Sequence, residues 1–147
     1  MGNIFDNRIL WTTIFVWAIA QGIKIFLEIV RERRFNFKWL ISTGGMPSSH
    51  VAAASALATT CGLHSGFDSA IFALAAVFAL VTMFDAQGVR RSAGQQAAIL
   101  NQILDDIYWK KSKIVPNRLM EFLGHTPLEV IMGAFLGFFM SIILYTN

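Results

Sequence analysis

Long apolar runs constrain the fold of this chain more than any other feature. They cover residues 9–30, 70–84 and 128–146. The first run is long enough, as a helix, to cross about 30 Å of hydrocarbon, and no short apolar core with a cleavage site precedes it, so we expect it to be retained. Hydrophobic residues make up 55% of the chain and charged residues only 14%, which favours an integral membrane protein over a soluble one.

The remaining segments complete an all-helical picture. Residues 49–63 form an Ala-rich helix that is short for a span, and its small side chains would let neighbouring helices approach closely. Ile99, Ile103 and Ile107 recur every four residues in a polar stretch, which predicts an amphipathic helix near the interface or packed on the bundle. Alternating runs typical of a barrel are too few. We therefore expect an all-α, polytopic membrane helical bundle with about four spanning segments plus an amphipathic helix, as one domain over residues 1–147.

Positive charge is clustered rather than arranged in one stripe. The net charge is +3, and the basic residues lie at 31–38, 90–91 and 110–118, a distribution that does not suggest nucleic-acid binding. The positive-inside tendency places 31–50 and 88–127 on the cytoplasmic side, with both termini outside. We expect a bacterial cytoplasmic membrane protein with its site on the cytoplasmic face. So small a bundle is compatible with a homodimer.

One glycine-rich turn interrupts the apolar chain, at residues 44–50, GGMPSSH. The glycines permit positive φ and the proline restricts the entry, so Ser48, Ser49 and His50 fall in the first turn of the next helix. Free backbone N–H groups there, with two hydroxyls, form a place for an anion such as phosphate, close to His50. Alternatively, Ser48 or Ser49 only caps the helix and His50 is interfacial.

A second turn, LGHTPLEV at residues 123–130, repeats this design. Thr126 and Pro127 are the expected N-cap and first helical residue. Glu129 follows His125 by four positions, so its carboxylate can hold one imidazole nitrogen and leave the other free as a nucleophile. Thr126 and Glu129 also fit a capping box, which is a purely structural alternative.

Two histidines at two helix starts fit phosphoester cleavage, in which one imidazole attacks phosphorus and another protonates the leaving oxygen. Cations must neutralise the phosphate oxygens. Lys24 is the first candidate, because a charge within an apolar segment is functional by default. The full set of candidate phosphate-binding residues is Lys24, Arg31, Ser48, Ser49, Arg90, Arg91 and Arg118.

Carboxylates outside these motifs have several possible roles. Asp85, at the end of an apolar helix, can orient a histidine, bind a metal or pair with Arg90 or Arg91, and we favour the ion pair. The acidic residues show no metal-ligand spacing, so we predict no metal and no cofactor. His64 is interpreted as a loop residue, and the single Cys61 as a small packing residue.

Three blocks of the chain, GGMPSSH, DAQGVRRSAGQQA and GHTPLEV, resemble those of the divergent branch of the type 2 phosphatidic acid phosphatase superfamily. That branch is also described as acid phosphatase/vanadium-dependent haloperoxidase-related. The similarity covers residues 11–144. It implies a helical-bundle, metal-independent phosphatase.

Residue by residue, the resemblance implies specific roles. His50 would be the proton donor to the leaving group, with Ser49 in place of the family's glycine. His125 would be the nucleophile, with Glu129 in place of the orienting aspartate.

The resemblance also implies which cations bind phosphate. Lys24 and Arg31 have the expected six residues between them, although Glu32 stands where a proline is usual. Arg118 precedes His125 by seven positions, one more than the pattern, so Arg90 or Arg91 can fill its role.

The sequence thus predicts a membrane lipid-phosphate phosphatase that forms a phosphohistidine. Phosphatidate, phosphatidylglycerophosphate and isoprenoid phosphates are candidate substrates, delivered by the lipid bilayer. The alternative is a catalytically silent protein that binds or transports a lipid phosphate. A structural membrane subunit is the third possibility.

Overall fold

The computed structural model describes residues 3–33, 45–108, 119 and 124–146, and all regular structure in these ranges is helical. A short 3-10 helix precedes five α-helices. They are η1 (Ile4–Asp6), α1 (Arg8–Glu32), α2 (Ser49–Ser65), α3 (Ala70–Gln87), α4 (Val89–Tyr108) and α5 (Pro127–Thr146). The all-α prediction is confirmed, and the observed helices contain the predicted apolar segments.

Side-chain caps fix where three of these helices begin. Asn7 Oδ1 accepts from the Leu10 amide at 3.0 Å before α1, and Ser69 Oγ accepts from the Phe72 amide at 3.1 Å before α3. Ser48 is the N-cap of α2. Each cap satisfies an amide that has no partner within the first turn of its helix.

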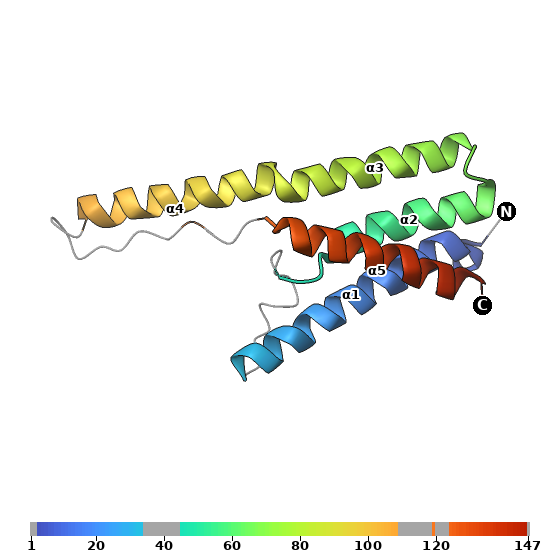
Figure 1. Cartoon of the computed structure of the whole chain (residues 1–147), viewed down its shortest axis with the longest axis horizontal. Coiled ribbons are helices and arrows are strands. Elements are labelled where there is room, and N and C mark those ends of the chain that lie inside the picture. Colours follow the sequence, from blue (N-terminus) through green and yellow to red (C-terminus); the bar gives the residue numbers. More distant parts are fainter. Residues whose placement is uncertain (1–2, 34–44, 109–118, 120–123, 147) are drawn as a thin grey trace.

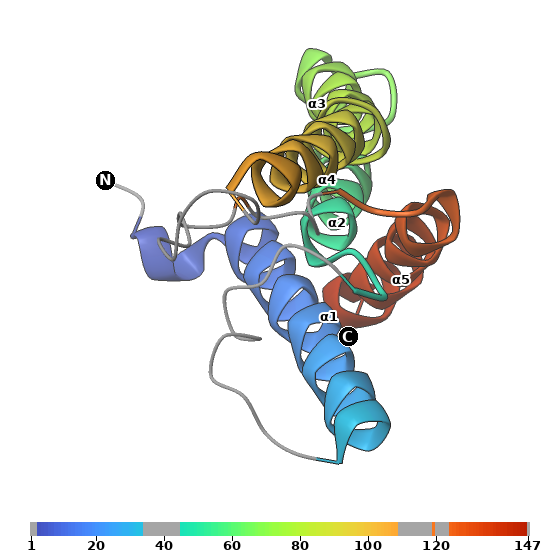
Figure 2. The ribbon, with the colours of Figure 1, turned by 90° about the vertical axis from the view of Figure 1, so that its left-hand side faces the viewer.

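Helix α2 occupies the middle of the bundle. It contacts α1, α3 and α5, which lie around it when the helices are viewed from one end (Figure 2). Its small side chains make this possible, since Ala52, Ala54 and Ala56 are buried and allow three neighbours to approach closely. The core of the protein is therefore built around α2.

Three helical segments are long and apolar enough to cross a membrane: α1, the continuous stretch Ala70–Asp105, and α5. The expectation of about four spans is therefore corrected to three candidates. The difference is α2, which is 17 residues long and rich in alanine, serine and threonine. It is buried by protein rather than by lipid, whereas the other three present large apolar side chains such as Leu74 and Phe135 outward.

Helices α3 and α4 follow one another almost in line, and α4 extends beyond the rest of the bundle (Figure 1). Only Gly88 separates them. The stretch Ala70–Asp105 contains 36 residues, which corresponds to about 54 Å of helix. Since the hydrocarbon core is about 30 Å thick, much of α4 lies outside it when α3 spans the bilayer. The predicted amphipathic helix thus exists, with Ile99 and Ile103 exposed.

The two termini lie at the same end of the bundle (Figure 1), since α2 also runs from one end of the bundle to the other although it is not among the three candidate spans. Contacts between helices tie this end together. The Arg8 guanidinium donates to the Tyr145 carbonyl at 2.9 Å, and the Tyr145 hydroxyl lies 2.6 Å from His64 Nδ1. His64 is therefore not a loop residue, as the sequence suggested, because it lies in the last turn of α2 and contacts α5.

Candidate functional site

The three sequence blocks meet at the end of the bundle opposite the termini. The Ser48 amide donates to the Glu129 carbonyl at 3.2 Å, which joins the start of α2 to the start of α5. The His125 amide donates to the Ala86 carbonyl at 3.0 Å, which joins the turn before α5 to the last turn of α3. Backbone hydrogen bonds thus hold GGMPSSH, DAQG and GHTPLEV side by side.

Helices α2 and α5 run parallel, because they meet at Ser48 and Glu129 at one end and at His64 and Tyr145 at the other. Gly133 permits this close approach, since a Cβ there would lie 2.6 Å from the Ser48 carbonyl oxygen. Each helix start carries the equivalent of about half a positive charge. Two such starts side by side favour a bound anion at this end of the bundle.

His125 is held in a defined orientation before α5. Only 4% of its surface is exposed, and its Nδ1 lies 3.1 Å from Glu129 Oε2. An ionised carboxylate can only accept hydrogen bonds, so Nδ1 carries the proton when Glu129 is ionised. The other ring nitrogen, Nε2, then carries no proton. This tautomer is the one that a nucleophilic imidazole requires.

The capping role of Glu129 is present at the same time. The Thr126 amide donates to Glu129 Oε2 at 2.9 Å, and the Glu129 amide donates to Thr126 Oγ1 at 3.4 Å. The two interpretations of the sequence are therefore compatible, because one carboxylate oxygen accepts from Thr126 and contacts His125. The capping box fixes the carboxylate that in turn orients the imidazole.

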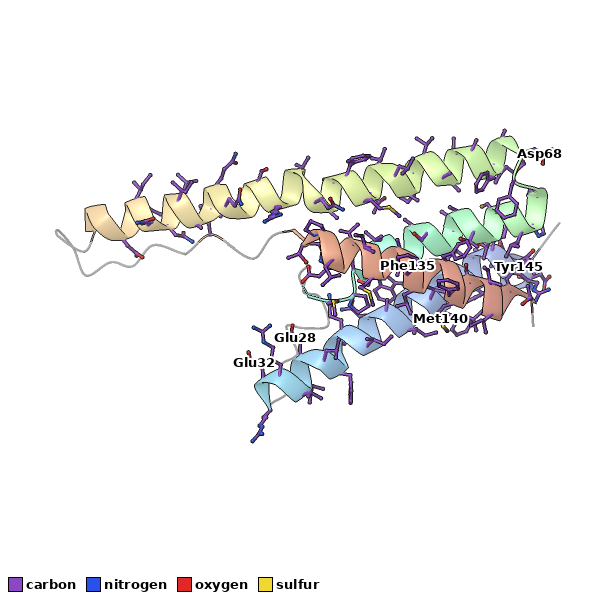
Figure 3. All side chains as sticks on the ribbon, in the orientation of Figure 1. Glu28, Glu32, Asp68, Phe135, Met140 and Tyr145 are labelled. Carbon is purple, nitrogen blue, oxygen red and sulfur yellow. The ribbon has the colours of Figure 1, made fainter. Side chains whose placement is uncertain are left out.

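Lys24 approaches the same place from α1. Its side chain is 2% exposed, and the charges of Glu28 and Glu129 act on it. Gly45 has a φ of 95° and lies against the aliphatic part of Lys24, where a Cβ would be 3.2 Å from Cδ. Glu28 projects from α1 on this side (Figure 3), and its carboxylate lies near Gly45 as well. The turn before α2 thus covers the lysine, and only a residue that tolerates positive φ fits there.

The turn residues themselves divide into buried and exposed groups. Ser48 and Ser49 are buried, and Ser48 Oγ accepts from the Val51 amide at 3.5 Å, as predicted for a cap. His50 follows in the first turn of α2 and is exposed. His50 is therefore exposed at the start of α2, whereas His125 is buried before α5.

Other candidates lie further from this cluster or outside the described residues. Arg31 is exposed on the last turn of α1, Arg91 is exposed on α4, and Asp85 is half-buried near the end of α3. The side chain of Arg90 and the whole of Arg118 are outside the described part of the chain. The preferred pairing of Asp85 with an arginine therefore stays a prediction.

Two contributors to the site were missed. The Ala86 carbonyl fixes the His125 backbone, yet any residue type supplies a carbonyl, so no sequence signal marks it. The close approach of Gly133 to the Ser48 backbone is the second, and no spacing in the sequence predicts that pair. Within the described ranges, no three His, Cys, Asp or Glu side chains gather closely enough to hold a metal ion.

Comparison with known proteins identifies the family of this chain and one relative. Residues 5–140 match the divergent PAP2 family. The chain is 38% identical over 152 aligned positions to the uncharacterized membrane protein YuiD of Bacillus subtilis (strain 168), and the alignment covers 97% of this chain and 96% of that protein. No solved structure matches.

Proposed function

This chain belongs to the divergent PAP2 family, and on that premise we propose that it is a metal-independent membrane phosphatase that acts on lipid phosphates. The observation that carries the proposal is the contact between His125 Nδ1 and Glu129 Oε2 at 3.1 Å. With Glu129 ionised, this contact puts the ring proton on Nδ1, so Nε2 is the ring nitrogen that would act as the nucleophile.

The charges around His125 support a phosphate ligand. Lys24 is buried within reach of the charge of Glu129, and the starts of α2 and α5 lie side by side. A lysine and two helix starts together offset the negative charge of phosphate oxygens. Ser48 and Ser49 add hydroxyls at the same helix start. Arg31, Arg90, Arg91 and Arg118 stay candidates for the remaining cation.

The reaction proceeds in two displacements. His125 Nε2 attacks phosphorus, the bond from phosphorus to the ester oxygen breaks, and His50 gives its proton to the departing alcohol. Water then attacks the phosphohistidine, the bond from phosphorus to nitrogen breaks, and His50 takes the proton from that water. Glu129 keeps Nδ1 protonated and stabilises the positive charge that the ring gains on attack.

The position of Lys24 suits a substrate anchored in the bilayer. Arg8 begins α1, and Lys24 lies sixteen residues further along, which is about 24 Å of helix. Because the hydrocarbon is about 30 Å thick, a bilayer that starts near Arg8 ends about 6 Å beyond Lys24 along an upright α1, which is about one helical turn. The site then lies near the boundary between hydrocarbon and headgroups, where phosphatidate, phosphatidylglycerophosphate or an isoprenoid phosphate presents its phosphate. We place this end on the cytoplasmic face, from the basic residues at 31–38 and 90–91.

A second function has one observation in its favour. Arg31 and Arg91, two of the expected phosphate ligands, are exposed among the residues that the structure describes. A site with fewer cations can hold a headgroup without stabilising the transition state. The alternative is therefore a protein that binds or transports a lipid phosphate without hydrolysing it.

The test uses protein purified in detergent and a panel of lipid phosphates. Phosphate release is measured for the wild type, His125→Ala and His50→Ala, with EDTA and with vanadate. A phosphatase keeps its activity in EDTA, loses it in vanadate, and loses it in both variants while still binding lipid. A binding protein releases no phosphate from any member of the panel, yet vanadate still raises its melting temperature.

A further inference from the structure

An open apolar groove of about 600 Å³ lies between α3 and α5, with α2 as its floor. Phe72 on α3 and Phe135 on α5 belong to its walls, and Ala58 and Thr59 of α2 to its floor. Phe135 lies on the side of α5 that faces this groove, whereas Met140 lies on the opposite side (Figure 3) and packs against Val16 and Ala20 of α1 and Ala52 and Ala56 of α2. The groove exists because α2 separates α3 from α5 over most of their length.

The groove offers few polar groups to a ligand. Its surface is almost entirely apolar. The Thr59 hydroxyl donates to the Ser55 carbonyl within α2 at 2.8 Å, so its hydrogen is already used. Since α3 and α5 are candidate spans, we expect the groove to face the hydrocarbon of the bilayer. An apolar chain therefore suits the groove better than a polar ligand.

The groove continues toward the candidate site. Met83 lines it on α3, one turn before Ala86, whose carbonyl accepts from the His125 amide. Ile131 lines it on α5, two residues after Glu129. A chain in the groove thus ends within about one helical turn of the backbone that positions the nucleophile.

The dimensions of the groove suit a small molecule or a lipid chain. The α3 wall runs from Phe72 to Met83, which is about 16 Å of helix. The volume of about 600 Å³ lies within the range of roughly 300–1,000 Å³ that is common for small-molecule sites.

We propose that this groove holds one hydrocarbon chain of the lipid phosphate whose headgroup reaches His125. The inference rests on the proposed function and deepens it. It assigns a substrate that must have a long apolar chain, and it has the substrate enter sideways from the bilayer between α3 and α5.

The test fills the groove without touching the site. Ala76 lines the groove on α3, and Ala73 is exposed one turn earlier on the same helix. Ala76→Phe and the matched control Ala73→Phe are compared with the wild type, with Ala76→Leu as the milder variant if the larger one does not fold. The substrates are hexadecyl phosphate and hexyl phosphate. A hexadecyl phosphate with a diazirine on its chain gives a readout that needs no turnover.

If the groove holds the substrate chain, Ala76→Phe lowers kcat/KM at least tenfold for hexadecyl phosphate and changes it less than twofold for hexyl phosphate. Ala73→Phe leaves both unchanged. Photolabelling maps to peptides of α3 and α5 in the wild type and falls in Ala76→Phe.

Three outcomes overturn the inference: labelling that is unchanged in Ala76→Phe, an effect of Ala76→Phe on kcat/KM that is equal for both substrates, or crosslinks through the groove to a second copy. If labelling follows the prediction while no phosphate is released, the inference stands and the proposed function is wrong.

Discussion

Replacing Gly133 with alanine tests whether the close approach of α5 to α2 holds the site together. The new Cβ would lie 2.6 Å from the Ser48 carbonyl oxygen, against about 3.4 Å for an ordinary contact. The two backbones must therefore separate by about 0.8 Å. The hydrogen bond from the Ser48 amide to the Glu129 carbonyl, now 3.2 Å, would stretch to about 4 Å, which is beyond hydrogen-bond distance.

Overpacking of this kind destabilises a protein by about 1–3 kcal/mol. For a chain of this size, each kcal/mol lowers the melting temperature by roughly 2–4 °C, so we expect a decrease of roughly 2–12 °C. Displacement of the His125 turn should also reduce phosphate release at least tenfold, because a misplacement of 1 Å can lower a rate by on the order of 10²-fold.

Thermal unfolding and phosphate release are measured on Gly133→Ala and on Gly22→Ala. Gly22 lies within α1 with no heavy atom within 4 Å of an added Cβ, so alanine there should raise stability by up to about 1 kcal/mol. A Gly133→Ala protein that matches the wild type in both measurements would refute the reasoning.

Three further substitutions probe separate contacts. Glu129→Gln keeps a cap acceptor for α5 but removes the charge beside His125. The melting temperature should therefore fall by only a few degrees, while turnover falls at least 10²-fold. Turnover equal to that of the wild type would argue against an orienting carboxylate. Lys24→Gln should weaken vanadate binding at least tenfold by thermal shift, because it removes a buried cation, and unchanged binding would place the phosphate elsewhere. The buried Asn101 side chain makes hydrogen bonds of 2.9 and 3.0 Å to the Leu119 backbone. Asn101→Ala should therefore lower the free energy of unfolding by about 1–3 kcal/mol and speed proteolysis after α4. Protease resistance equal to that of the wild type would contradict this expectation.

The sequence predicted the helices well because their apolar runs and caps are local features. Thr126 and Pro127 start α5 as expected, and Ser48 caps α2. The number of spans was not predictable in the same way. Whether α2 is covered by lipid or by protein depends on three neighbours, and its own composition cannot specify them.

The candidate site was predictable where side chains carry the signal. The spacing of His125 and Glu129 indicated a contact, and the structure contains it at 3.1 Å. The Ala86 carbonyl and the Ser48 backbone were not predictable, since every residue has these groups and only tertiary packing selects them. His64 was misassigned because its partner, Tyr145, lies 81 positions away.

The most direct measurement is to trap the covalent intermediate. Purified protein is mixed with a lipid phosphate, quenched rapidly under alkaline conditions that preserve phosphohistidine, and digested for mass spectrometry. The account predicts a phosphoryl group on His125 in the wild type and none in His125→Ala. Phosphate release without any phosphohistidine, or turnover retained in His125→Ala, would contradict it.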